Sequence, residues 1–384
     1  MDFSEVIGQN HLKSHLLTTI KNGRIPHSQL FIGKSGSGLL PIALSYAKEI
    51  LCHPFAKDSG EYVACANKVA KLGHPDLHFV MPVNTNEKVK KNPVSSNFSS
   101  EWREFVLNNP YAALYDWYQF LGIENKQGNI SKYEAEDISK KLSLKAYEGG
   151  YKVMIIWMAD KMNTECSNKI LKLVEEPPEK TVLLLLTEHE EKVLGTIQSR
   201  CQKLHFPLLS EDDISSQLTS NYNVIEYLAK NISRQANGDF NKALHLISNN
   251  EDDDEFEKWF IAWVRTAFRA KGNRSSINDL LSWSETLAKE GRETQKKFLG
   301  YCLSLFRQAL LKNYKADSLI YFESKDFKFS LEKFAPFVHQ NNIFGIMKAL
   351  EEAEYHVERN GNAKIIFTDL SIQLTRLIHK KELV

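Results

Sequence analysis

The sequence has no marked excess of charge of either sign. Its 49 lysine and arginine residues nearly balance 48 aspartate and glutamate residues, which leaves a formal net charge of +1. The global positive charge that is typical of many nucleic-acid-binding proteins is therefore missing. A local basic patch remains compatible with this balance, so composition alone assigns no DNA-binding residue.

Long apolar runs are also missing. No stretch approaches the roughly 18 to 20 continuous apolar residues that a membrane helix needs, and the start Met1-Asp2-Phe3-Ser4-Glu5 lacks the features of a secretory signal. Hydrophobic residues at 42% and charged residues at 25% are ordinary for globular proteins. We expect a cytoplasmic protein without a membrane partner.

Cysteine is scarce, and its number is odd. A few scattered cysteines in a long chain favour reduced thiols over a disulfide framework. The five are Cys52, Cys65, Cys166, Cys201 and Cys302.

The length of 384 residues predicts two or three domains. In the first half, short apolar runs alternate with amphipathic helical patterns, which predicts a parallel α/β sheet. An aromatic, asparagine-rich insertion at about residues 84–130 interrupts this pattern, and we interpret it as a partly helical elaboration. The predicted strands are Leu30–Ile32, Leu77–Met81, Val153–Trp157 and Val182–Leu186, and the predicted helices are Pro41–Leu51 and Asn168–Glu175.

After Pro207 the strand pattern stops. Ser210 and Asp213 form a plausible N-cap pair that opens a small helical unit running to about Ile247. The acidic segment 249–255 fits a linker or the first turn of a helix. Beyond it, apolar residues at helical spacing predict an all-helical region. We therefore divide the chain into residues 1–207, 208–249 and 250–384.

A glycine-rich loop, Gly33-Lys34-Ser35-Gly36-Ser37-Gly38-Leu39-Leu40, lies between a predicted strand and a predicted helix. This is the context of a Walker A loop, which cradles phosphates on backbone N–H groups. A working loop needs lysine and serine or threonine where this chain has Leu39 and Leu40. Lys34 stands five residues too early to replace the missing charge. We expect no functional nucleotide site at Gly33, Gly36, Gly38, Leu39 and Leu40.

Two other elements of an ATP site are also missing. The strand Val153–Ile156 is followed by Trp157 and Met158 instead of a magnesium-binding carboxylate. Asp160 comes too late, and we interpret it as the cap of the following helix. Asn241 stands where a phosphate-sensing arginine could sit. Joint loss of these elements indicates a module that keeps a nucleotide-binding fold without hydrolysis.

Several segments carry a more specific resemblance. Because of these segments, residues 1 to about 247 resemble the bacterial clamp-loader subunits of the AAA+ family. The segments are Val6-Ile7-Gly8-Gln9, similar to an adenine-pocket box, Pro26–Phe31, similar to the lead-in of the phosphate-loop strand, His74-Pro75-Asp76, Asn168–Pro178 with its Glu-Glu-Pro-Pro end, and Thr196–Cys201 with a Ser-Arg-Cys motif.

The resemblance implies a AAA+ α/β domain with a degenerate phosphate loop, a small helical lid and an all-α collar for oligomerisation. It implies a non-hydrolysing stator of the DNA polymerase III clamp loader, which places a sliding clamp on primed DNA. The implied partners are the gamma/tau motor subunits, the delta subunit, the clamp and primed DNA. ATP and magnesium would be bound by the neighbouring subunits, and this chain would need no cofactor.

The resemblance also assigns roles to the Ser-Arg-Cys motif. Arg200 would act as an arginine finger in the ATP site of an adjacent subunit, because a guanidinium stabilises charge on a transferring phosphoryl group. Ser199 would shape the turn, and Cys201 would pack as a small apolar group. Without the motif, a structural salt bridge of Arg200 would be the simpler interpretation.

Related loader subunits commonly carry a four-cysteine zinc module after the first helix. Here only Cys52 and Cys65 remain, with Asn67 and Lys68 where further thiolates would be expected. Structural zinc needs four ligands. His53 or His74 would have to complete the set, and we expect no metal.

Three alternatives stay open. An active motor ATPase would need lysine and serine or threonine at positions 39 and 40. The clamp-opening delta class is not expected to keep a Ser-Arg-Cys finger. A AAA+-derived DNA-processing scaffold outside the replisome is harder to separate, because fold and function diverge readily.

Overall fold

The computed structural model describes the chain except residues 125, 149, 249–250, 272, 317–318, 321, 323, 325, 327–328 and 381–384, and except the side chains of 251–254 and 274. The chain forms two compact units. Unit 1 contains Met1–Ile123 and Gln127–Leu244, and unit 2 contains Glu124–Lys126 and His245–Val384. The three-part division at residues 207 and 249 stays a prediction.

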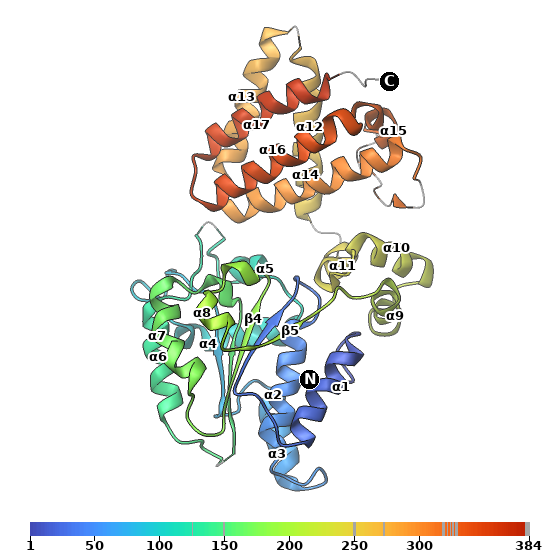
Figure 1. Ribbon diagram of the computed structural model, residues 1–384. Coiled ribbons are helices and arrows are strands. Elements are labelled where there is room, and N and C mark those ends of the chain that lie inside the picture. Colours follow the sequence, from blue (N-terminus) through green and yellow to red (C-terminus); the bar gives the residue numbers. More distant parts are fainter. Residues whose placement is uncertain are drawn as a thin grey trace. The chain divides into compact units, whose positions relative to one another are not determined.

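Unit 1 is built on a five-stranded parallel sheet with the strand order β2-β3-β4-β1-β5. Figure 1 shows this sheet, with β4 and β5 labelled, among the helices of unit 1. This confirms the predicted parallel α/β sheet. The sequence analysis missed β5, an edge strand with mostly exposed side chains, because it has no apolar run. The strands are β1 (Ser28–Ile32), β2 (Leu77–Val80), β3 (Lys152–Ile156), β4 (Thr181–Thr187) and β5 (Gln202–His205).

Helices cover both faces of this sheet, so β3 and β4 are buried along their whole length. Alternate strand residues enter two different cores: Val153 and Ile155 pack into one, and Met154 and Ile156 into the other. The first core contains α1 (Asn10–Lys21), α2 (Leu39–Cys52) and α3 (Gly60–Ala70); the second contains α6 (Lys132–Ser143), α7 (Thr164–Glu175) and α8 (Gly195–Gln198).

The insertion is partly helical, as predicted, and contributes to the first core. Trp102 and Trp117 are fully buried and meet edge to face at 5.2 Å, and Trp102 lies 5.1 Å from Trp157 after β3. The indole N–H of Trp117 donates to the Pro82 carbonyl at 2.9 Å. Its helices are η1 (Ser95–Phe98), α4 (Ser99–Asn108) and α5 (Leu114–Phe120).

Three helices after the sheet form the small helical unit expected from the sequence. The Ser210 hydroxyl accepts the Asp213 N–H at 3.0 Å, which confirms the predicted N-cap. The helices, which we call the lid, are α9 (Glu211–Tyr222), α10 (Glu226–Ala236) and α11 (Phe240–Ile247).

Unit 2 is helical around an aromatic core. Trp263 stacks on Trp283 at 5.0 Å and donates its indole N–H to the Ser371 hydroxyl at 2.9 Å. The apolar stripes are mostly buried as predicted, but Phe268 is 43% exposed. The helices are α12 (Glu251–Arg269), α13 (Arg274–Lys289), α14 (Arg292–Asn313), α15 (Leu331–Phe334), η5 (Ala335–Phe337), α16 (Gln340–Glu358) and α17 (Ala363–Ile378).

The acidic segment 249–255 falls partly within α12, whose first residue is Glu251. Residues 249 and 250 lie outside the described part of the chain. Among the described helices, none is long and apolar enough to cross a membrane.

The buried insertion predicts a large effect of removing Trp117. We expect Trp117→Ala to lower the free energy of unfolding of unit 1 by about 3–5 kcal/mol, as for other fully buried large aromatic residues. Hydrogen exchange of the β3 and β4 amides measures this change without requiring that both units unfold together. Phe120→Ala is the control, because that ring is 40% exposed. Equal effects of the two substitutions would contradict the placement of the insertion in the core.

Candidate nucleotide cleft and arginine finger

The backbone of a phosphate loop is present between β1 and α2. Gly36 and Gly38 have φ values of +69° and +97°, a conformation that favours glycine. Gly38 directly precedes the first residue of α2. The strand–loop–helix context that the sequence predicted is therefore formed.

Leu39 and Leu40, at the end of the loop, place apolar side chains next to it. Leu40 is buried in the first core. Leu39 turns back over the start of the loop, and a Cβ atom at Gly33 would lie 2.7 Å from Leu39 Cδ1. Neither side chain supplies the positive charge or the hydroxyl that a nucleotide-binding loop uses.

A small pocket with a cavity volume of about 30 Å³ lies beside the loop. Burial raises the pKa of Glu188, which lines it, to about 7, with the charges of Asp160 and Asp239 adding to the shift and Lys34 opposing it. Burial likewise raises the pKa of Asp239 to about 6. Carboxylates thus gather where a polyphosphate would need positive charge.

Asp160 does not cap the next helix, so that interpretation is wrong. Asn163 caps α7 instead, since its side-chain oxygen accepts the Cys166 N–H at 2.8 Å. A short 3-10 turn, η2 (Ala159–Lys161), separates β3 from this cap. Within it, Asp160 accepts the Thr187 hydroxyl at 3.0 Å and lies 3.2 Å from the Lys161 ammonium.

Asn241, at the position considered for a phosphate-sensing arginine, is buried in α11. Its amide nitrogen donates to Asp116 at 2.7 Å, and its amide oxygen accepts from Asn109 at 2.8 Å. Both partners belong to the insertion. The sequence gives no signal for this connection, because the residues lie more than 100 positions apart.

Arg200 follows α8 with its side chain 36% exposed. The guanidinium donates to the Glu175 carboxylate at 2.9 Å and to the Thr196 carbonyl at 3.0 Å. Glu175 ends α7 and is 55% exposed, and such a surface pair contributes only about 0–1 kcal/mol. The structural salt bridge therefore forms, but it holds the arginine weakly.

Ser199 and Cys201 flank Arg200 directly after α8. The Ser199 hydroxyl donates to the Thr196 carbonyl at 3.2 Å and helps to close the turn. Cys201 is buried in the second core, and burial raises the pKa of its thiol to about 12.

The prediction that all thiols are reduced is wrong for two cysteines. Cys52 at the end of α2 and Cys65 in α3 form a disulfide, with their Cα atoms 5.9 Å apart. The two helices pack together, and this proximity cannot be inferred from the number of cysteines in the chain. Cys166, Cys201 and Cys302 are free and buried.

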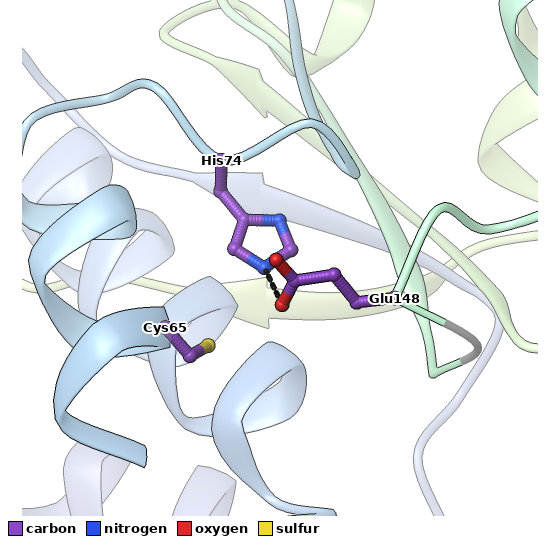
Figure 2. A group of neighbouring side chains, drawn as sticks. All are labelled: Cys65, His74 and Glu148. Carbon is purple, nitrogen blue, oxygen red and sulfur yellow. Dashed lines mark hydrogen bonds and ion pairs between the residues drawn. The ribbon is translucent and has the colours of Figure 1, made fainter. Parts of the chain in front are cut away.

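Cys65, His74 and Glu148 place possible metal-ligand atoms within 4.8 Å of one another (Figure 2). The Cys65 sulfur is engaged in the disulfide. His74 Nδ1 accepts the Asp76 N–H at 3.1 Å, which assigns the ring proton to Nε2, and Nε2 then donates to Glu148 at 3.1 Å. Cysteine binds zinc as a thiolate, and histidine binds it through a nitrogen with a free lone pair. This arrangement does not fit zinc.

The same contacts give the His-Pro-Asp triplet a structural role. The Asp76 carboxylate accepts the N–H groups of Tyr147 and Glu148 at 2.7 and 3.1 Å. Glu148 also contacts the Lys68 ammonium. The hydrogen bond from Lys68 is the largest cause of the lowered pKa of Glu148. The cluster thus anchors the segment before β3.

The parallel sheet, the phosphate loop and the three-helix lid define the class of the protein, a AAA+-like module. A family model described as "DNA polymerase III, delta subunit" matches residues 8–210, more than half of the chain. The chain therefore belongs to this DNA polymerase III family, and among clamp-loader subunits it is delta-prime-like.

Curated relatives agree with this assignment. The chain is 25% identical to DNA polymerase III subunit delta-prime of Bacillus subtilis over 361 residues, 94% of both chains. It is 28% identical to the tau/gamma subunit of Haemophilus influenzae over 56% of this chain but only 25% of that protein. The likeness to the gamma and tau subunits is thus limited to part of their length.

Two solved structures from Thermotoga maritima are similar at 13% sequence identity. One is a gamma-subunit-related protein, with a TM-score of 0.39 and coverage of 95% of this chain and 99% of that chain. The other is the RuvB Holliday junction branch migration motor, with a TM-score of 0.39 and coverage of 82% and 79%. Because these scores are low, the fold assignment stands on the sheet topology itself.

The Cys52–Cys65 bond predicts a defined thiol count. Protein purified without reductant and unfolded in guanidinium is expected to show three reactive thiols, and five after reduction. The Cys52→Ser/Cys65→Ser variant should lose about 2–4 kcal/mol of unfolding free energy relative to the oxidised protein, since a short loop is no longer closed. Reduced wild type is the control and should match the variant. Five thiols before reduction would contradict the disulfide.

Proposed function

We propose that this chain is a non-hydrolysing stator of the DNA polymerase III clamp loader. It supports loading of the sliding clamp onto primed DNA and supplies Arg200 to the ATP site of an adjacent motor subunit. The observation that carries the proposal is the exposed, weakly paired Arg200 in a protein whose own phosphate loop has Leu39 and Leu40 at the lysine and hydroxyl positions. Such a chain can complete a neighbouring site while lacking its own.

The cleft itself supports the absence of hydrolysis. Among the described residues that line the pocket, the positively charged side chain is that of Lys34. It interacts electrostatically with Glu188. Asp160, the first carboxylate after β3, is engaged by Thr187 and Lys161. A magnesium–polyphosphate complex would therefore meet few positive groups, and Asp160 would have to leave its partners to bind the metal.

The proposed partners are gamma/tau motor subunits, the delta subunit, the clamp and primed DNA. Full-length similarity to a delta-prime subunit and partial similarity to tau/gamma subunits support this set. We further propose that residues 250–384 form the oligomerisation collar, that residues 208–249 form a lid on residues 1–207, and that the protein acts in the cytoplasm. No observation favours an active motor or a scaffold outside the replisome.

The finger proposal predicts a selective loss of turnover. In a reconstituted loader, Arg200→Ala should reduce clamp-stimulated ATP hydrolysis at the adjacent site by on the order of 10³-fold, the usual effect of removing an arginine finger. In the complete loader, total ATP hydrolysis falls only by the contribution of the adjacent site. Single-turnover measurements on loaders with one competent ATP site therefore show the loss more clearly.

Arg234→Ala is the matched control, because Arg234 is another exposed arginine in this unit that faces a glutamate, Glu211 at 3.5 Å. Size-exclusion chromatography verifies that the complex is intact. Unchanged hydrolysis in an intact Arg200→Ala loader would reduce Arg200 to a structural residue.

The degenerate loop predicts that the isolated chain does not hydrolyse Mg-ATP above the blank and does not bind a fluorescent ATP analogue. Neutral leucines replace the phosphate-binding lysine and the magnesium-binding hydroxyl. Turnover that co-purifies with the chain and disappears in Lys34→Ala would show that the cleft is active and would overturn the stator proposal.

A further inference from the structure

We propose that residues 109–116 of the insertion, here called the strap, take the place of a nucleotide and lock the lid onto the sheet domain. In a nucleotide-switched module, a bound ligand contacts both core and lid and thereby selects the lid position. Here side chains of the chain itself make that bridge. The contacts that carry this inference lie within unit 1, and the inference does not depend on the proposed role in clamp loading.

The strap first contacts the N-terminal segment and the phosphate loop through Tyr111. Its buried hydroxyl accepts the Ile7 N–H at 2.9 Å. The ring edge lies 3.6 Å from the position that a Cβ at Gly38 would occupy. Tyr111 therefore lies between the segment identified as an adenine-pocket box and the first turn of α2, and it lines the remaining pocket.

The strap next reaches the lid helix α11. The Tyr111 ring meets Phe240 edge to face at 5.0 Å. Asn241 donates to Asp116 at 2.7 Å and accepts from Asn109 at 2.8 Å. Because Asn241 is buried, these bonds form in a low-dielectric environment, where loss of a partner is costly.

The lid in turn lies directly on the phosphate loop. The Phe240 N–H donates to the Gly36 carbonyl at 3.2 Å. A Cβ at Gly36 would lie only 1.8 Å from Asp239 Oδ1, so this close approach requires glycine. Gln9 adds a further tie, since its amide donates to the Ser37 and Pro207 carbonyls at 3.0 and 2.7 Å.

These contacts connect the N-terminal segment, the phosphate loop, the lid and the strap to one another. Each is made by residues of the folded chain, so the lid position does not depend on a ligand. A ligand shifts an equilibrium only by its differential affinity for two states. Because side-chain contacts already hold the lid in one position, binding of Mg-ATP would have no lid equilibrium to shift.

Hydrogen exchange of the full chain tests the strap. In Tyr111→Ala and in Asn241→Ala, we expect amides of residues 211–247 to exchange about tenfold faster or more, because the lid opens locally, while β3 and β4 keep their protection. Tyr147→Ala is the matched control, since that tyrosine is 81% exposed. Mg-ATP should leave the exchange of the wild-type lid unchanged.

If Tyr111→Ala fails to fold, Tyr111→Phe keeps the ring and removes only the acceptor for the Ile7 N–H. It should accelerate lid exchange less than Asn241→Ala does. Wild-type protection of the lid in both Tyr111→Phe and Asn241→Ala would overturn the proposal. Equal acceleration over sheet and lid would also overturn it, because the residues would then act as ordinary core residues.

Discussion

The contact between Gly36 and the first turn of α11 is the constraint on which the rest of unit 1 depends. Asp239 and Phe240 approach the loop so closely that no side chain fits at position 36. The glycine also adopts φ of +69°, which most residues avoid. Gly36 is therefore necessary for the docking of the lid on the loop, whatever the loop binds. This contact accounts for a glycine at position 36 in a loop that has leucine at positions 39 and 40.

Burial of aromatic side chains contributes to the stability of unit 1. The aromatic side chains of the insertion pack against Trp157 at the end of β3, beside the cleft. Burial of such rings supplies much of the favourable free energy of a core. Near this core, burial raises the pKa values of Glu188 and Asp239, as expected for poorly solvated carboxylates.

The sequence predicted the features that rest on local patterns: the buried strands, the loop between β1 and α2 and the Ser210 cap. It missed β5, because an exposed edge strand needs no apolar run. It also missed the Cys52–Cys65 disulfide and the link from Asn241 to Asp116, since both depend on side chains brought together by folding. Asp160 was misassigned because a 3-10 turn separates β3 from α7.

The two ends of the proposed mechanism differ in how firmly the chain holds them. Arg200 is paired with Glu175 at the surface, where solvent screening leaves such a pair worth about 0–1 kcal/mol. Moving this guanidinium to a phosphate of a neighbouring subunit would therefore cost little. Asn241 is buried with both sides of its amide bonded, so moving the lid would leave polar groups unpaired. In the proposed stator, the weakly held Arg200 would therefore move toward a neighbour's nucleotide while the lid keeps its position.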